Sequence, residues 1–483
     1  MLKKYIFENP EIVRYFRLSF RYPKYIGLTV SYFAFLFIVY FIIYLALNKL
    51  SDTYFTLIYV LTIGWEFVMA FYISTYFTSN SFSLEKEKNT LDFIRMSTVD
   101  RKAIAIGKLL GPSIFIWFLI LLTTPIVFGA FSFTNVPFSH FLIVHIHMFI
   151  YSIAFNTIGL FSAVVAPKKS QASGAGIAIA MIMTLVAGTL IRNREENPFY
   201  NLFVVMQNKI EYNINFLDFF GFSLPSFVVI LVFIGFFVYW FLHSLIRKID
   251  NELSKPFTKK ESIVFFTLFQ VLILGVLWNQ IQFGRSEFIM ALMMFNFVVV
   301  SFLSAILTPT FDDTVTFINK KQDYAKSLLD PKGKNNFLIL ILSIIALVFT
   351  LIIAIKSSLY LNTSQFFINF TITSIVFILF NYFYSQLMYL CNIIFIKNAN
   401  TMSAILIAIA LFIPIPFGAF GDSRDLGALL LLNPFMVLSL TYLSKNIVDL
   451  VNIFEIAFLI IASLGITLFV SSKDQKIIEK HKL

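Results

Sequence analysis

One carboxylate stands inside a long apolar run, where its chemistry would be unusual. Glu66 lies in the sequence GWEFVMAF, near the middle of an apolar stretch at residues 54–78. A charged carboxylate at the centre of a bilayer costs about 2.5–3.5 kcal/mol on insertion scales, so this side chain should face a helix bundle, a cavity or a partner group. We therefore expect a polar contact in a substrate path, a protonatable site, or a hydrogen-bonded structural glutamate.

Three histidines lie near one end of the apolar run at 139–165: His140, His145 and His147. His140 and His147 are seven residues apart and share a helix face, whereas His145 does not align with them. A metal site would need further ligands, and no acidic or cysteine residue stands near the histidines in the sequence. We therefore predict no metal site. The single cysteine, Cys391, excludes a disulfide within the chain.

Motifs that carry hydrolysis are absent from the sequence. Gly107-Lys108 lacks the preceding glycine and the following hydroxyl residue of a phosphate-binding loop. There is no H-E-x-x-H and no G-x-S-x-G, and the polar loops are too short to house a catalytic domain. We therefore expect no catalytic residues, no enzyme activity and no cofactor bound by this chain.

The composition is that of a helical membrane protein. Hydrophobic residues make up 59% of the chain and charged residues only 13%, against about 25% charged residues in average proteins. Apolar runs of about 20 residues or more match the length of a helix that crosses a bilayer. The first residues show no apolar core followed by a cleavage site, so no removable signal peptide is expected.

We predict an all-α polytopic membrane protein with about twelve transmembrane helices. The predicted spans are 25–48, 54–78, 109–131, 139–165, 172–192, 225–246, 262–283, 286–309, 337–356, 366–395, 401–419 and 448–471. The charged segment Arg247–Glu261 separates two groups of six spans, and an even number of spans in each makes them two parallel six-helix halves. The predicted organisation is a cytoplasmic arm (1–24), a first half (25–248), a linker (249–261), a second half (262–472) and a basic tail (473–483).

The lysine and arginine residues predict the orientation in the membrane. With the N-terminus in the cytoplasm, 29 of the 37 lysines and arginines fall on the cytoplasmic side and eight on the outer side. Both termini are therefore predicted to be cytoplasmic, in a plasma membrane. This asymmetry also explains the net charge of +11, so we expect a lipid bilayer around the chain and no nucleic-acid partner.

A repeated tripeptide is consistent with a duplication. Asn197-Pro198-Phe199 lies between the fifth and sixth predicted spans, and Asn433-Pro434-Phe435 lies between the eleventh and twelfth. Each is followed by an apolar stretch that is too short to cross a bilayer. We interpret both as short re-entrant or interfacial helices on the outer face.

The N-terminal arm is predicted to contain a helix that lies in the membrane interface. Asn9 can cap this helix, with Pro10 at its first position and Glu11 in its first turn. One side of the helix is apolar, and another carries the arginines Arg14, Arg17 and Arg21. Such a pattern suits a helix whose arginines face anionic headgroups.

The segment Ser79–Lys108 is the most charged part of the first half, and we interpret it as a polar cytoplasmic loop. Asn89 can cap a short helix that runs from Thr90 to Met96 and has an apolar face. Asp100 and the residues beside it can open the helix that enters the third span. A short helix held between two long spans suits the transmission of force from a soluble partner.

Residues at fixed spacings in this segment resemble those of a known family. The pattern E-x-E-x-x-T-L-D, then a basic residue, then G-K, is formed by Glu85, Glu87, Thr90, Leu91, Asp92, Arg101, Gly107 and Lys108. It resembles the membrane subunit of ATP-binding-cassette exporters of the type-2 permease class, over roughly residues 9–248. The resemblance implies an elbow helix in the arm and a coupling helix, including Phe93 and Ile94, that contacts a separate ATPase chain. ATP and magnesium would bind to that partner.

The second half departs from this pattern. Its corresponding loop lacks the E-x-E and G-K elements, but Pro309 can start a helix with Asp312 and Asp313 in its first turn. A second coupling role for these three residues is therefore inferred from position. If it holds, one chain supplies both membrane halves, which other members of the family obtain by dimerising.

We interpret the chain as the permease of an ATP-driven exporter with both halves fused and an ATPase subunit, in two copies, as partner. Two alternatives remain open. An ion-coupled secondary transporter would use Glu66 as its proton or cation site. A membrane-embedded enzyme acting on lipid would use His140 with Glu66, although the two residues lie at different depths of different spans.

Overall fold

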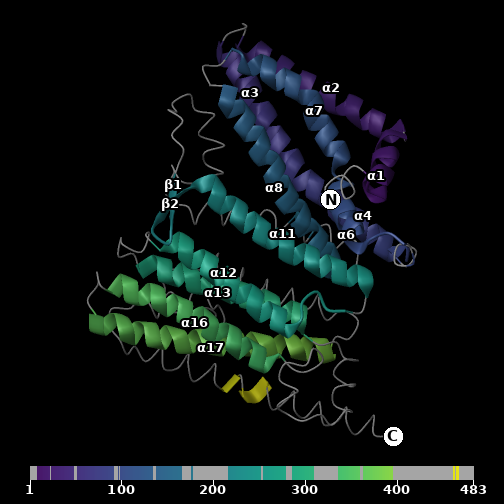
Figure 1. The fold of residues 1–483 in the computed structure, drawn as a ribbon. Helices are drawn as coiled ribbons and strands as arrows, with labels where there is room; N and C mark the ends of the chain where they lie inside the picture. The colour runs from purple at the N-terminus through teal and green to yellow at the C-terminus, as the bar shows by residue number, and fades with distance from the viewer. Residues whose placement is uncertain are drawn as a thin grey trace, which may run out of the picture. The chain divides into compact units, whose positions relative to one another are not determined.

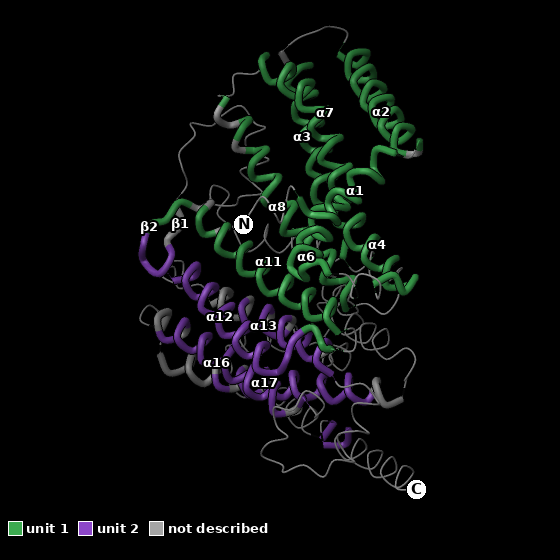
Figure 2. The backbone as a smooth tube through the Cα atoms, turned by 45° about the vertical axis from the view of Figure 1, so that its right-hand side comes forward, with its two compact units in different colours: residues 1–217, 223–256 green, residues 218–222, 257–483 purple. Residues whose placement is uncertain are grey.

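A computed structural model of the chain shows a protein built almost entirely of helices (Figure 1). The structure describes residues 8–21, 23–47, 52–91, 96, 98–133, 138–165, 174, 176–177, 216–251, 254–278, 286–308, 335–358, 363–394, 461–462 and 464–466. The chain divides into two compact units, residues 1–217 with 223–256 and residues 218–222 with 257–483 (Figure 2). The division after Pro256 falls within residues 249–261, the segment predicted to be the linker.

Unit 1 begins with the amphipathic helix α1 (Pro10–Arg21) and the apolar helix α2 (Pro23–Leu47). One long helix follows, made of α3 (Asp52–Val68), a π-helical turn (Met69–Ile73) and α4 (Ser74–Glu87). The other helices are α6 (Arg101–Leu110), α7 (Ile114–Phe131), α8 (Phe138–Val165) and α11 (Ser226–Asp250). A short hairpin of β1 (Phe216–Phe219) and β2 (Phe222–Pro225), in which residues 218–222 belong to unit 2, precedes α11.

Unit 2 contains four long helices that lie side by side (Figure 1): α12 (Lys259–Leu277), α13 (Ser286–Leu307), α16 (Asn336–Ser358) and α17 (Thr363–Ile394). α12 begins with a capping box in which Thr258 Oγ1 accepts from Glu261 N at 3.2 Å and Thr258 N donates to Glu261 Oε2 at 2.8 Å. Between α12 and α13, Gln270 Nε2 donates to Asn296 Oδ1 at 2.6 Å. Such a bond between amides links apolar helices that have little else to orient them.

The helices confirm a polytopic all-α membrane protein. Six in the described part are long and apolar enough to cross a membrane: Tyr25–Leu47, Tyr54–Glu87, Ile114–Phe131, Val144–Val165, Leu231–Asp250 and Lys259–Leu277. α13, α16 and α17 coincide with three further predicted spans. The predicted spans 172–192, 401–419 and 448–471 lie largely outside the described residues, as do both Asn-Pro-Phe tripeptides. The total of twelve spans and the cytoplasmic termini therefore stay predictions.

The structure differs from the prediction at Ser79–Lys108, because much of this segment is helical and buried. The helix of the second span continues through the π-helical turn to Glu87 instead of ending near residue 78. The buried hydroxyl groups of this polar stretch are satisfied within the helix by donating to carbonyls one turn back, as Thr78 does to Ser74 O at 2.9 Å and Ser83 to Ser79 O at 2.9 Å.

Asn89 ends a helix and does not begin one, so its predicted role as an N-cap is wrong. Its φ of 55° is left-handed, a conformation that asparagine tolerates better than most residues. Its N–H donates to Lys86 O at 3.2 Å, and the Thr90 N–H donates to Glu85 O at 3.0 Å. This pair of bonds is a Schellman motif, which satisfies the last carbonyls of α4.

The predicted third span is divided between two helices. α6 ends at Leu110, and α7 begins at Ile114 after the turn Gly111-Pro112-Ser113. Pro112 explains the break, because it has no N–H to continue the ladder of α6. As a result α6 is a separate amphipathic helix that precedes the membrane-crossing helix α7.

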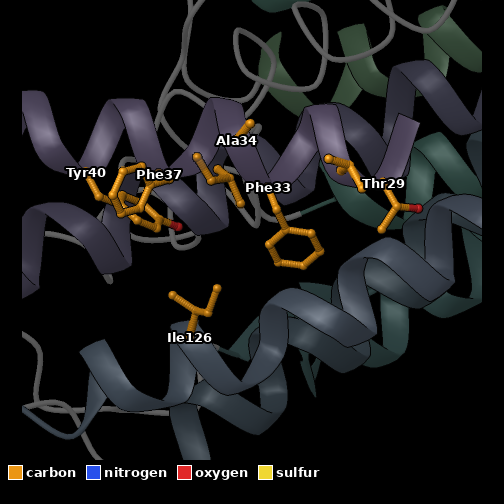
Figure 3. Close-up of a pocket in the computed structure, with 8 residues that line it drawn as sticks. Thr29, Phe33, Ala34, Phe37, Tyr40 and Ile126 are labelled. Carbon is orange, nitrogen blue, oxygen red and sulfur yellow. The ribbon is translucent and has the colours of Figure 1, made fainter. Parts of the chain in front are cut away.

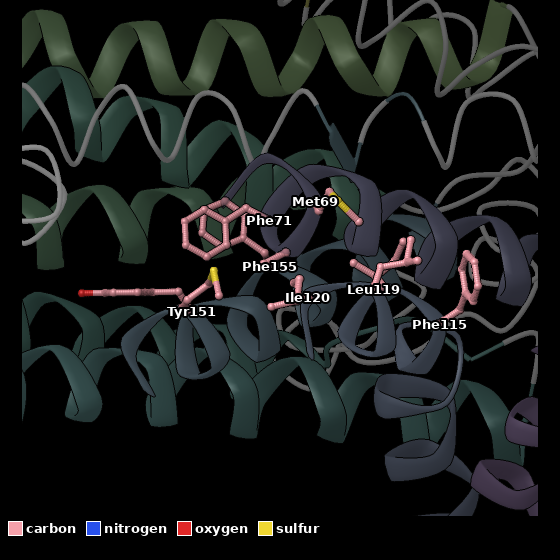
Figure 4. Close-up of a cluster of buried hydrophobic side chains, with 10 residues drawn as sticks. Met69, Phe71, Phe115, Leu119, Ile120, Tyr151 and Phe155 are labelled. Atoms are coloured by element: carbon pink, nitrogen blue, oxygen red, sulfur yellow. The ribbon is translucent and has the colours of Figure 1, made fainter. Parts of the chain in front are cut away.

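The core of unit 1 is aromatic and aliphatic, and it lies where the π-helical turn meets α7 and α8 (Figure 4). The rings of Phe71 and Phe155 stack with their centroids 4.8 Å apart. Met69, Leu119 and Ile120 belong to the same buried cluster. This core fixes the depth at which the polar groups of α3, α7 and α8 face one another.

α4 and α8 approach each other closely because small residues line their contact. Ser74 Oγ donates to Asn156 Oδ1 at 2.7 Å, and the hydroxyls of Ser79 and Ser162 lie 3.3 Å apart. A Cβ on Gly159 would lie 2.7 Å from Thr75 O. Small side chains of this kind let helix backbones come together in membranes, where no hydrophobic force brings helices together.

α2 exposes most of its apolar surface and forms one wall of a groove. Thr29, Phe33, Phe37 and Tyr40 of α2 line a cavity of about 570 Å³ with Ile126 of α7 (Figure 3). In a membrane-spanning chain, exposed apolar surface of this kind is covered by lipid tails or by another helix.

We predict that Gly159→Ala destabilises the protein by about 1–3 kcal/mol, because the new methyl group overpacks the contact between α4 and α8. Gly129→Ala in α7 is the matched control, since nothing lies within 4 Å of its Cβ position. That change should be neutral or stabilise the helix by up to about 1 kcal/mol. Thermal unfolding of the two purified variants measures the difference. Equal midpoints would contradict the close approach of α4 and α8.

Candidate functional site

The elbow helix α1 is fastened at its start to α6. Asn9 caps α1 as predicted: its Oδ1 accepts from Glu11 N at 3.0 Å, and its carbonyl accepts from Val13 N at 3.0 Å. The Nδ2 of the same side chain donates to Ala103 O of α6 at 2.7 Å. Asn9 is completely buried. One side chain therefore both starts α1 and holds it against α6.

Four charged side chains meet where α1, α4 and α6 converge: Glu11, Arg14, Glu85 and Lys108, here called the elbow ion cluster. Lys108 Nζ pairs with Glu11 Oε2 at 2.9 Å and also with Glu85. Arg14 Nη2 lies 2.9 Å from Glu11 Oε2 and 2.5 Å from Glu85 Oε1. Each cation thus contacts both carboxylates, and the cluster has no net charge. The Lys108 side chain is 1% exposed and that of Glu85 12%, so solvent neutralises little of either charge.

Tyr15 of α1 contacts the elbow ion cluster through both its hydroxyl group and its ring. Its hydroxyl hydrogen-bonds Ser81 of α4 and donates to Glu85 Oε1 at 3.1 Å. Lys108 Nζ lies 5.4 Å from the centre of the Tyr15 ring, within range of a cation–π contact. Burial raises the pKa of the Tyr15 phenol, and the charge of Glu85 raises it further. The phenol therefore remains a neutral hydrogen-bond donor at physiological pH.

Two glycines on α6 and just after it explain how α1 comes so close. A Cβ on Gly107 would contact Glu11 and lie 2.9 Å from Asn9 Oδ1, and one on Gly111 would contact the ring of Tyr15. Both positions therefore require the absence of a side chain. Contacts within unit 1 explain the G-K pair of the sequence pattern. Gly107 leaves room for α1, and Lys108 neutralises the carboxylate of Glu11 on that helix.

The connection between α4 and α6 is partly buried. Leu91 packs in a cluster with Ile104 of α6, Leu160 of α8 and Leu245 of α11. Thr90 Oγ1 donates to Glu85 O at 3.2 Å. Met96 is 74% exposed. Leu91, which is helical, thus anchors the start of this connection among α6, α8 and α11.

Arg101 ties α6 to the end of α11. Asp100 caps α6 by accepting from Lys102 N at 3.1 Å, which agrees with the prediction that these residues open a helix. The next residue, Arg101, donates through Nε to Asp250 Oδ1 at 3.1 Å. The side chains of this pair are 31% and 56% exposed, so the pair adds little stability.

The predicted coupling residues therefore fall into three groups. Glu85, Leu91, Arg101 and Lys108 have partners within unit 1, and Thr90 bonds the end of α4. Glu87 is exposed at the last turn of α4. Asp92, Phe93, Ile94, Pro309, Asp312 and Asp313 lie outside the described residues. Contact of any of these residues with an ATPase stays a prediction.

A second polar site lies deeper in unit 1, around Glu66. The carboxylate is completely buried. Its Oε1 accepts from Thr123 Oγ1 of α7 at 2.5 Å, and its Oε2 lies 3.4 Å from His145 Nε2 of α8. The sequence showed Glu66 and the histidines but could not show this pairing, because the residues belong to different spans. In the described part of the chain, no three metal-ligating side chains come together.

We predict that Lys108→Gln lowers the free energy of unfolding by about 3 kcal/mol, because it leaves two buried carboxylates with one cation. The double variant Glu85→Gln with Lys108→Gln restores the charge balance and should recover part of that loss. Lys102→Gln removes an exposed lysine from the same helix and serves as control. Thermal unfolding in detergent compares the variants. A Lys108 variant as stable as the Lys102 variant would disprove the buried cluster.

Comparison with known proteins gives one match. Residues 12–203 match the family model described as ABC-2 type transporter. The matched segment covers about two fifths of the chain and includes Arg14, Glu85 and Lys108 of the elbow ion cluster, together with Glu66 and His145. No curated protein and no solved structure matches the sequence. Over residues 12–203, the chain is thus similar to the ABC-2 type transporter family.

Proposed function

We propose that the chain is the permease of an ATP-driven ABC exporter and works with a separate ATPase subunit. The ABC-2 match over the first part of the chain supports the permease role. The ATPase would bind ATP and magnesium. The observation that carries the coupling proposal is the elbow ion cluster, which joins α1 to both helices that flank the loop at 88–100.

The elbow ion cluster suggests how a displacement of that loop would spread. Glu85 stands near the end of the long helix that starts at Asp52, and Lys108 stands near the end of α6. Both bind Glu11 or Arg14 of α1. A partner that pushes the loop would therefore shift α1, α4 and α6 together. The ATPase shifts the equilibrium between two membrane states only if it binds one of them more tightly.

The remaining features of the proposal rest on sequence. Both membrane halves would be fused in one chain, with two ATPase copies, twelve spans and both termini on the cytoplasmic side of a plasma membrane. The second coupling element would include Pro309, Asp312 and Asp313. Export is the proposed direction of transport.

A second candidate is an ion-coupled secondary transporter, which the buried pair of Glu66 and His145 favours. The two candidates differ in what drives transport. Reconstitution with an ATPase partner whose phosphate loop is disabled separates them. Transport by the ABC permease stops, whereas ion-coupled transport continues until a protonophore removes the proton gradient.

We predict that Glu87→Lys and Glu85→Gln affect different steps. Glu87 is exposed, so reversing its charge should weaken association with the ATPase by about tenfold or less without lowering the stability of the permease. Glu85 lies in the elbow ion cluster, so its variant should still bind the ATPase but transport less substrate per ATP hydrolysed. Co-purification measures association, and ATPase and transport assays in the same vesicles measure coupling.

Lys260→Glu is the control, because it reverses an exposed charge at the start of α12. It should leave association and coupling unchanged. If both glutamate variants retain wild-type association and coupling, the proposed role of this region is wrong. Co-purification also tests whether one permease chain binds two ATPase subunits.

A further inference from the structure

The ring orientation of His145 fixes where its protons are. Nδ1 lies 2.9 Å from the carbonyl oxygen of Phe141, one turn earlier in α8. A carbonyl oxygen only accepts hydrogen bonds, so Nδ1 must carry a proton. Nε2 is then either an unprotonated acceptor in the neutral imidazole or a second N–H in the imidazolium.

Nε2 faces one particular atom. It lies 3.4 Å from Glu66 Oε2, and neither atom has another hydrogen-bond partner among the described residues. A deprotonated carboxylate and an unprotonated Nε2 would place two lone pairs opposite each other. One proton between the two atoms removes this conflict, whether it resides on the carboxyl group or on the imidazole. In either case the pair has no net charge.

The groups around the pair do not supply a competing cation. Tyr32 and Tyr40 of α2 and Tyr59 of α3 interact electrostatically with Glu66, and their phenols are uncharged at neutral pH. From α7, Thr123 offers a hydroxyl. In the described part of the chain, His145 is the one ion-pair partner of Glu66. A completely buried carboxylate in these surroundings has to share a proton or stay uncompensated.

We propose that Glu66 and His145 form a proton-binding site that holds one proton between Oε2 and Nε2. The bound proton joins α8 to α3, while Thr123 joins α7 to the same carboxyl group. The ligand is a proton and not a metal ion, because no third His, Cys, Asp or Glu side chain joins this pair in the described part of the chain. The site goes beyond the proposed ATP-driven transport and does not depend on it.

The proposal predicts a specific dependence of stability on pH. The folded pair holds one proton, whereas an unfolded chain holds one on its histidine below about pH 6.5 and none above it, since its glutamate loses its proton near pH 4.3. Stability should therefore be level between about pH 5 and 6.5. Above that range the ratio of folded to unfolded protein should fall about tenfold per pH unit until the folded pair loses its proton.

Two variants isolate this contribution. Glu66→Gln can still bond Thr123 and His145 but holds no extra proton. The contribution of this site to the stability of the variant should therefore be level above about pH 6.5. It should fall as the pH decreases below 6.5, because the histidine of the unfolded chain then binds a proton. His145→Gln removes the histidine whose titration in the unfolded chain produces the level range, so the plateau between about pH 5 and 6.5 should be absent from its profile. Glu87→Gln removes an exposed carboxylate and should retain the wild-type profile.

The measurement is the thermal unfolding midpoint of the purified full-length chain in lipid nanodiscs between pH 5 and 9.5, in choline buffers. The difference in stability between wild type and Glu66→Gln should shrink steadily as the pH rises from about 5, until the folded pair loses its proton. Profiles that run parallel for the wild type and both pair variants would overturn the proposal. A saturable rise of the wild-type midpoint at pH 9 with sodium or potassium, absent in Glu66→Gln, would also overturn it and assign the site to a monovalent cation.

Discussion

Charge that is removed from water has to be neutralised within the protein, and this requirement shapes unit 1. In the elbow ion cluster two cations and two carboxylates balance, with Lys108 almost fully buried. Breaking such a cluster by removing one partner costs more than any single exposed ion pair contributes. The positions of α1, α4 and α6 are therefore mutually dependent.

Close approach of the backbones makes this neutralisation possible. Gly107 and Gly111 leave room for Glu11 and Tyr15 of α1, and Gly159 leaves room for Thr75 where α4 meets α8. Without the gaps at Gly107 and Gly111, α1 could not bring Glu11 to Lys108. Small residues thus determine which helices can share a polar site in a membrane protein.

The two polar sites of unit 1 lie along one continuous helix. Glu66 belongs to α3 and Glu85 to α4, with the π-helical turn Met69–Ile73 between them. Nineteen residues of helix correspond to about 28 Å. π-helical turns inside long helices are frequent at functional sites. A displacement at the cytoplasmic loop proposed here would reach the deeper pair of Glu66 and His145 through this helix.

The class of the protein follows from the amino-acid sequence alone, because long apolar runs admit few structures besides membrane-crossing helices. The sequence also located the cap at Asn9 and the start of α6 at Asp100, which depend on neighbours in the chain. It failed at Asn89, because a side chain that caps a helix start also tolerates the left-handed turn at a helix end.

Which charged groups pair with one another depends on how the helices pack. The pattern of Glu85 and Lys108 predicted contact with another protein, whereas the structure gives both residues partners on α1, 70 or more positions away in the chain. Likewise His145 did not align with the other histidines, yet it faces Glu66. Helical periodicity places a side chain on its own helix, but the rotation and depth of each helix come from packing against the others.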